Sequence, residues 1–258
     1  MAATTDGTKE GASMAQDKER RALLAAGETL VVERGLANVT PAMVEEAAGL
    51  PAGRFAAHFD GPRGLLRALS AQFTEQMLTV TDQSTRSGIW QGAAARDVVE
   101  VAVRSIFDVV LGKRELVRAF LAAATTDPEY AADLKRIGSH MAARIVTVFA
   151  ECNNVPARPS RAVAFSLLTA VALAHHTILV GDEWSGVAFS KEQLVAETTR
   201  AIGAYLGLQP TIAIKREGPD TAPTTAVRAV DAGELDGETR ETEAPTTEVE
   251  VPASLRSV

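Results

Sequence analysis

Signals that begin and end α-helices recur along the first 208 residues, and they constrain the fold more than any other feature of the chain. Thr40-Pro41 and Asp127-Pro128 each place an N-cap residue before a proline at the first helical position. Gly49 stands where a helix would end. Between such signals the apolar residues recur at helical spacing, and strand-like alternation is rare. The sequence therefore predicts an all-α fold.

Nine helices are expected, separated by short breaks. The last begins with Ser190 and Gln193, which have the spacing of a capping box. A short arm precedes the first helix over residues 1–16, and we expect it to be flexible because it is small and polar. The approximate helix ranges are 17–34, 41–48, 51–58, 62–80, 96–111, 115–124, 128–151, 159–180 and 190–207.

The end of the chain has a different composition. Residues 209–258 hold ten acidic against five basic residues and almost no regularly spaced aliphatic side chains. Such a segment buries too little apolar surface to offset the entropy of ordering, so we expect a disordered acidic tail. Most of the formal net charge of −7 therefore lies in the tail. This charge does not exclude a local basic face on the folded part, because only nearby charges act strongly across a screened solution.

Three features bear on the compartment. Cys152 is the only cysteine, which excludes an intrachain disulfide and favours a reducing environment. The N-terminal residues lack the apolar stretch of a secretory signal. Residues 162–180, AVAFSLLTAVALAHHTILV, are uncharged and long enough to span a membrane, but a helix buried on both sides of a soluble bundle is the preferred interpretation. We expect a cytoplasmic protein.

Residues 40–59 have the spacing of two short helices joined by a tight turn. Val44, Leu50 and Phe55 are apolar at positions that would face the two helices inward, and Gly49 occupies the turn. Two interpretations fit this stretch equally well: a helix pair within a helical core, or a helix-turn-helix that binds DNA.

A wider pattern favours DNA binding. Residues 21–66, RALLAAGETLVVERGLANVTPAMVEEAAGLPAGRFAAHFDGPRGLL, resemble the N-terminal domain of TetR-family transcriptional regulators. The matching features are ERG at the end of the first helix, Thr40 at the start of the second, AAGLPAG at the turn, FAAHF over 55–59 and the pair Leu65-Leu66.

The resemblance implies a domain layout. A DNA-binding domain of three helices would occupy residues 17–61, and a larger helical domain would occupy 62–208. The larger domain would enclose a small-molecule effector among the fifth to eighth helices. It would also form a homodimer through the helices near 159–180 and 190–207. The fourth helix joins the two domains and would link them mechanically.

Four positions depart from the family pattern. Ala56 replaces a tyrosine that often contacts the DNA backbone, Pro51 a frequent serine, and Pro62 a frequent lysine. Glu45 replaces a usual alanine. Its carboxylate could pair with Arg54 and orient it, or could repel phosphate; pairing is preferred because a buried unpaired carboxylate is costly.

The candidate DNA-binding residues lie on and around the third helix and in the basic N-terminal stretch. Arg54 is the candidate for a bidentate contact to guanine, its alternative being a solvated or Glu45-paired arginine. Arg63 and Thr40 suit phosphate, and small alanines permit close approach to the bases. For His58, aromatic packing at the helix end is the favoured alternative. The set is Lys18, Arg20, Arg21, Thr40, Pro51, Ala52, Arg54, Ala57, His58 and Arg63.

The candidate effector residues are mainly apolar, which suggests an apolar or amphipathic ligand. For each of them, ordinary core packing is the favoured alternative. The set is Phe107, Phe120, Met141, Phe149, Phe165 and His175.

An enzyme is disfavoured. His140, His175 and His176 have no acid or cysteine at ligand spacing nearby, so we expect no metal, cofactor or nucleophilic site. The sequence thus predicts a TetR-like regulator that is a homodimer, binds double-stranded operator DNA and is released by a small molecule; repression is the commoner role in the resembled family. The alternative is a dimeric interaction protein of the same fold with weak or partner-dependent DNA binding.

Overall fold

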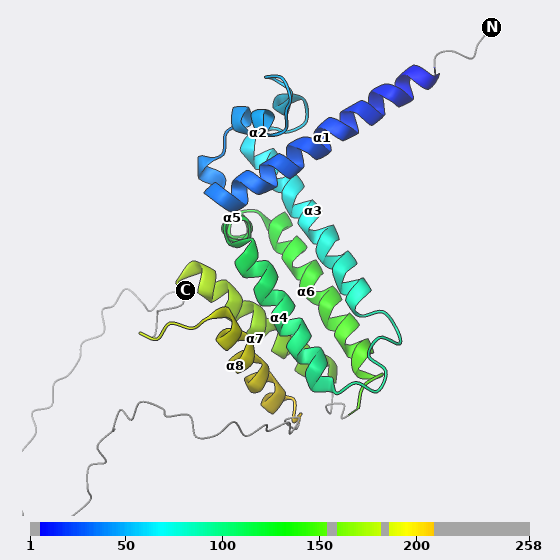
Figure 1. Ribbon diagram of the computed structural model, residues 1–258, viewed down its shortest axis with the longest axis vertical. Coiled ribbons are helices and arrows are strands. Elements are labelled where there is room, and N and C mark those ends of the chain that lie inside the picture. The colour runs from blue at the N-terminus through cyan, green and yellow to red at the C-terminus, as the bar shows by residue number, and fades with distance from the viewer. Residues whose placement is uncertain (1–5, 154–158, 182–185, 209–258) are drawn as a thin grey trace, which may run out of the picture. The chain divides into compact units, whose positions relative to one another are not determined.

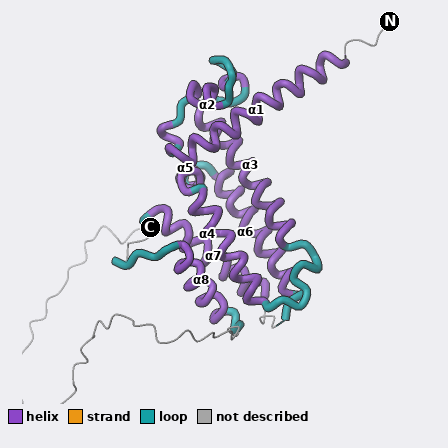
Figure 2. Tube along the Cα trace, in the orientation of Figure 1, coloured by secondary structure: helices purple, strands orange, loops and turns teal. Residues whose placement is uncertain are grey.

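The structure is a computed structural model that describes residues 6–153, 159–181 and 186–208. These residues form eight α-helices and two short 3₁₀ helices, and they contain no strand beyond an isolated bridge between Ala94 and Asn153 (Figures 1 and 2). The predicted all-α fold is confirmed. The acidic segment 209–258 and the first five residues of the predicted arm lie outside the described residues.

The helix bounds follow the expected order along the chain. The N-terminal elements are α1 (Asp6–Arg34), η1 (Leu36–Asn38), α2 (Pro41–Ala47), η2 (Phe55–Ala57) and α3 (Gly61–Ser84). The remaining elements are α4 (Ala95–Gly112), α5 (Arg114–Ala124), α6 (Pro128–Phe149), α7 (Pro159–Leu179) and α8 (Lys191–Tyr205). Helix α1 begins earlier than predicted, so that residues 6–16 of the expected flexible arm are helical.

The predicted caps are present. The Thr40 hydroxyl accepts the Met43 N–H at 3.3 Å, and the Asp127 carboxylate accepts the Glu129 N–H at 3.0 Å. The Ser190–Gln193 capping box makes both of its reciprocal hydrogen bonds. Because each cap satisfies a backbone donor that the helix itself leaves unpaired, these side chains fix where α2, α6 and α8 begin.

The prediction of a third α-helix over residues 51–58 is wrong. This stretch is a turn followed by the 3₁₀ helix η2 and lies between α2 and α3 (Figure 2). Gly53 has a φ of 88°, in the left-handed region, which ends any helix begun at Pro51. The N–H groups of Ala57 and His58 then bond three residues back, to Arg54 and Phe55, which is the 3₁₀ pattern.

The elements around this turn share one apolar core. Leu23 and Val31 of α1, Val44 of α2, Phe55 of η2 and Leu65 of α3 are all at most 2% exposed. Phe55 also packs against Phe59, with ring centroids 5.2 Å apart. The inward-facing apolar spacing seen in the sequence therefore holds, although the second element is shorter than an α-helix.

The larger part of the chain is a helical bundle. Helix α6 packs against both α3 and α7, while α4 packs against α7 and α8 (Figure 1). Phe107, Phe120 and Phe149 are fully buried side chains of this bundle. Because α3 begins among the N-terminal elements and continues along α6, it is shared by both parts of the fold.

Helix α7 is long and apolar enough to cross a membrane by length and composition alone. In the structure Val163, Ala170 and Ile178 of α7 are buried, and the helix packs against α4 and α6. Phe165 and Leu168 are exposed. The prediction that this helix is buried on both sides is therefore wrong within a single chain, because Phe165 and Leu168 remain more than half exposed.

Candidate functional site

Arg54, the predicted base-reading residue, is held by a carboxylate that the sequence did not single out. Its Nε donates to Oε2 of Glu19 at 3.0 Å, and its Nη2 contacts the same oxygen. His58 Nε2 lies 3.4 Å from that oxygen. Glu19 lies on α1, far from Arg54 in the sequence, and no local pattern marks the pair. The three side chains form what we call the Glu19 cluster (Glu19, Arg54 and His58).

The cluster favours the ionised form of Glu19. The hydrogen bond from Arg54, and next that from His58, lower the pKa of the Glu19 carboxyl below its ordinary value. The Arg54 side chain remains 41% exposed, so one side of the guanidinium is open to solvent. To form a bidentate contact with another group, the Arg54 guanidinium must therefore break or share its hydrogen bonds with Glu19.

Glu45 has a different partner from the one expected. Its Oε1 accepts the backbone N–H of Phe55 at 2.6 Å, and the residue is only 6% exposed. The predicted pairing with Arg54 is wrong because the carboxylate points at the start of η2. The hydrogen bond satisfies the buried carboxylate and fixes the turn between α2 and η2.

Most of the other candidate DNA-binding residues are exposed, whereas His58 is partly buried. Arg20 stacks over the Phe59 ring at 5.6 Å, and Arg21 Nε donates to the Asp17 carbonyl at 3.2 Å. These basic residues belong to helix α1, as the predicted helix over residues 17–34 implied. The exposed set is Lys18, Arg20, Arg21, Thr40, Pro51, Ala52, Ala57 and Arg63.

A cavity of about 220 Å³ lies in the helical bundle. Five helices, α3 to α7, contribute side chains to it, together with Trp90 from the segment between α3 and α4. Among its lining residues there is no Asp, Glu, Lys or Arg. The contribution of α3 was not expected, since the sequence placed the effector pocket among the later helices.

Three of the six candidate effector residues line this cavity: Phe120, Met141 and His175. The other three do not, contrary to expectation. Phe107 is fully buried in the core, and Phe149 borders a small apolar gap between α4, α6, α7 and α8. Phe165 is 52% exposed and packs against Tyr205, with ring centroids 5.0 Å apart. Helical spacing placed these residues inside or near the bundle but could not distinguish core, cavity and outer face.

His175 is the ionisable side chain of the cavity wall. Burial lowers the pKa of its imidazole, so the ring is neutral at neutral pH. No residue of the described ranges forms a hydrogen bond with this ring. A neutral imidazole can both donate and accept, which makes His175 a ready polar contact for a molecule in the cavity.

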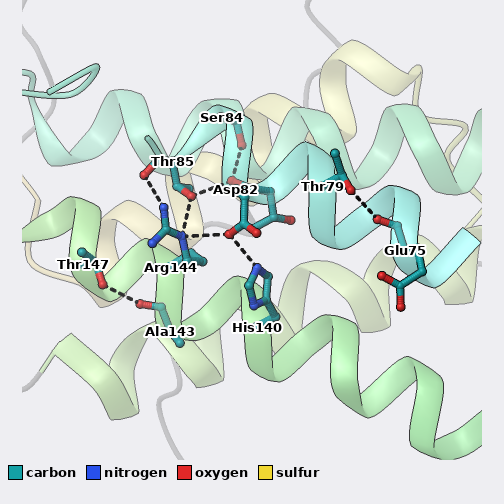
Figure 3. Close-up of polar contacts among 10 residues, drawn as sticks. Glu75, Thr79, Asp82, Ser84, Thr85, His140, Ala143, Arg144 and Thr147 are labelled. Carbon is teal, nitrogen blue, oxygen red and sulfur yellow. Dashed lines mark hydrogen bonds and ion pairs between the residues drawn. The ribbon is translucent and has the colours of Figure 1, made fainter. Parts of the chain in front are cut away.

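The end of α3 is tied to α6 beside the cavity (Figure 3). Arg144 donates from Nε to the Thr85 hydroxyl at 3.0 Å and from Nη2 to the Thr85 carbonyl at 2.9 Å. Oδ1 of Asp82 lies 3.2 Å from Arg144 Nε and 2.9 Å from His140 Nε2. Thr85 also lines the cavity. A molecule in the cavity therefore contacts the same turn that anchors α3.

In residues 6–153, 159–181 and 186–208, no three His, Cys, Asp or Glu side chains gather in a way that could hold a metal ion.

No family model and no curated protein matches the chain. Many solved structures do match it, and they share one fold. A candidate TetR-family transcriptional regulator from Mesorhizobium loti has a TM-score of 0.61 at 14% identity, covering 74% of this chain and 96% of its own. A candidate regulator from Streptomyces coelicolor has a TM-score of 0.53 at 21% identity, covering 73% and 98%.

The transcriptional regulator FadR from Bacillus subtilis, solved in complex with stearoyl-CoA, is similar too. Its TM-score is 0.51 at 12% identity, and the match covers 72% of this chain and 97% of FadR. The chain therefore has the fold of TetR-family transcriptional regulators, in agreement with the predicted all-α fold.

Proposed function

We propose that this chain is a TetR-family transcriptional regulator that acts in the cytoplasm, probes operator DNA as a homodimer and is released from it by a small molecule, most simply as a repressor. One observation carries the proposal: α3 belongs both to the N-terminal core, through Leu65, and to the wall of the apolar cavity, through Phe73 and Thr81. The proposal requires no metal or cofactor.

The DNA contacts in this proposal come from the exposed surface of α2, η2 and the start of α3. Ala52 and Ala57 allow the backbone to approach base edges closely, and Arg63 reaches phosphate. Arg54 reads a base when the guanidinium turns from Glu19 toward the groove. Because the neutral edge of a base competes poorly with the Glu19 carboxylate for the guanidinium, this turn costs free energy, and we expect few direct base contacts.

The effector acts through α3. A molecule that fills the cavity presses on Met77, Thr81 and Thr85, and the Arg144 contacts transmit this to α6. The ligand shifts DNA binding only if it favours one position of α3 over the other.

The homodimer forms through α7 and α8. Phe165 and Leu168 of α7 and Tyr205 of α8 are large apolar side chains that are more than half exposed. Burial of such a patch against its copy stabilises a dimer by the usual hydrophobic term.

The test is binding of the full chain to the DNA upstream of its own gene, with a scrambled duplex as control, over a series of salt concentrations. We expect a complex that prefers the upstream DNA and weakens steeply as salt rises. The second candidate, a dimeric interaction protein with weak DNA binding, is favoured by the engaged state of Arg54 and by the missing third helix. A dimer that shows no salt-sensitive, sequence-preferring complex would support that candidate and reject the regulator.

A further inference from the structure

The wall of the cavity has no formal charge to offer a ligand. It is built from aliphatic and aromatic side chains, with His175 and a few hydroxyls as its polar groups. The hydroxyls of Ser84, Ser105 and Thr85 donate to main-chain carbonyls of their own helical turns. The Trp90 indole N–H likewise donates to the Ser84 carbonyl at 2.7 Å. These groups are already partnered, so they add little to recognition.

The arginine bound to Thr85 of the cavity wall does not supply the missing charge. Arg144 uses its Nε and Nη2 on Thr85 and lies in contact with Asp82. A carboxylate or phosphate in the cavity would therefore lose its hydration without gaining a counter-ion, which is strongly unfavourable. This wall favours molecules without charge.

We propose that the cavity takes an uncharged, largely apolar molecule carrying one hydrogen-bonding group, which pairs with the His175 imidazole, and that it rejects the matching anion. The inference rests on the proposed function, since the cavity is the effector site of that proposal. It also separates this chain from FadR of Bacillus subtilis, which was solved in complex with stearoyl-CoA, a highly charged molecule.

Size sets a further limit. The cavity of about 220 Å³ exceeds the roughly 150 Å³ that holds a benzene molecule in an engineered core. The cavity therefore has room for more than a single aromatic ring, and a medium-length alcohol is a suitable probe.

The experiment compares 1-octanol with octanoate at pH 7.5 on the full chain. The reporter is Trp90 fluorescence in a Trp184→Phe background, where Trp90 is the sole tryptophan. We expect octanol to change the emission saturably and octanoate to bind at least about tenfold more weakly, because only the anion must shed its charge hydration. Equal or tighter binding of octanoate, or no saturable binding of octanol, would overturn the inference.

Two variants locate the polar contact. His175→Phe keeps an aromatic ring and removes the hydrogen bond, and we expect octanol affinity to fall about two- to tenfold. Ser105→Ala is the matched control, because its hydroxyl is bonded to the Val101 carbonyl at 2.8 Å, and it should leave the affinity unchanged. An unchanged affinity in His175→Phe, or an equal loss in both variants, contradicts the role of His175.

A third variant asks whether charge alone sets the selectivity. Met141→Lys places a cation in the wall and should bring octanoate binding close to, or above, that of octanol; persistent rejection of octanoate by the folded variant would contradict the charge explanation.

Circular dichroism establishes that each variant is folded. Upstream-DNA binding is measured on the same samples. Loss of DNA binding with octanol selectivity intact rejects the proposed function alone, whereas DNA binding with a preference for octanoate rejects this inference alone.

Discussion

The N-terminal elements and the cavity present their candidate functional groups in opposite ways. Arg54 is charged and already paired with Glu19 across α1 and η2, whereas His175 is neutral and has no hydrogen-bond partner among the described residues. A molecule that binds Arg54 must compete with the Glu19 carboxylate. A molecule that binds His175 meets a polar group without a hydrogen-bond partner among the described residues, in an otherwise apolar wall. Under the proposed function, DNA contact by Arg54 must therefore displace an existing ion pair, whereas a ligand that binds His175 displaces none.

The largest expected effect is in the wall of the cavity. Phe120 is 1% exposed, packs against Phe73 at 5.5 Å and forms part of the cavity wall. We expect Phe120→Ala to lower the free energy of unfolding by about 3–5 kcal/mol, as measured by urea denaturation, because it removes buried area and enlarges the cavity. Phe165→Ala is the control on the exposed face and should cost little in stability but weaken the dimer. Equal losses would show that both side chains are core.

The N-terminal region should separate two arginines. Arg54→Ala should relax sequence preference by about 1–3 kcal/mol of discrimination if Arg54 reaches a guanine. Arg63→Ala should weaken binding to all sequences about equally and flatten the salt slope by roughly one unit. Binding to upstream and scrambled duplexes measures both. Unchanged binding in both variants would mean that DNA docks elsewhere.

Glu19→Gln sharpens the comparison by weakening the hold on Arg54. We expect DNA binding to become tighter by a few-fold, because Arg54 no longer has to break an ion pair with a carboxylate before it contacts DNA. Glu33→Gln, an exposed position of the same helix, is the control and should change little. Weaker DNA binding in Glu19→Gln would instead mean that the cluster positions Arg54 for the base.

The same pair carries a pH dependence with a defined sign. Because the pKa of Glu19 is lowered in the folded chain, its contact with Arg54 stabilises the fold above the ordinary value of 4.5. That stabilisation is lost as pH falls through the folded value. We expect this part of the acid unfolding profile to disappear in Glu19→Gln, as followed by circular dichroism; an unchanged profile would show that the pair contributes nothing to stability.

A smaller effect on stability is expected from alanine substitutions at two helical glycines, one in each region, because the two glycines are packed differently. A Cβ at Gly27 of α1 would lie 2.9 Å from Leu65 Cδ1, whereas a Cβ at Gly138 of α6 meets nothing within 4 Å. We expect Gly27→Ala to lose about 1 kcal/mol after its gain in helix propensity, and Gly138→Ala to gain about 0.5–1 kcal/mol. Thermal unfolding of both variants gives the signs. Matching signs would refute the close α1–α3 approach.

Much of the fold was predictable because its signals are local. Thr40, Asp127 and Ser190 each mark a helix start by a side chain that caps its own next turn. The helix expected over 51–58 failed on another local feature, Gly53, whose positive φ outweighed the proline start. Gly53 was the one residue in the sequence of this stretch that argued against a helix.

The candidate site was less predictable because its contacts are distant in sequence. Glu19 and Arg54 lie 35 residues apart, and periodicity gives no reason to pair them. The cavity draws on five helices, so apolar spacing alone could not tell Phe120, which lines it, from Phe107, which does not. The exposure of Phe165 likewise depends on which helix faces remain uncovered in three dimensions.

The link between the two regions through α3 is tested most directly by reciprocal binding on the full chain. Octanol affinity is measured from Trp90 fluorescence with and without saturating upstream DNA, and DNA affinity with and without octanol. We expect each to weaken the other by the same factor, about 5–150-fold, because coupling between two sites is reciprocal. Octanol and DNA affinities that are independent of each other would contradict the account.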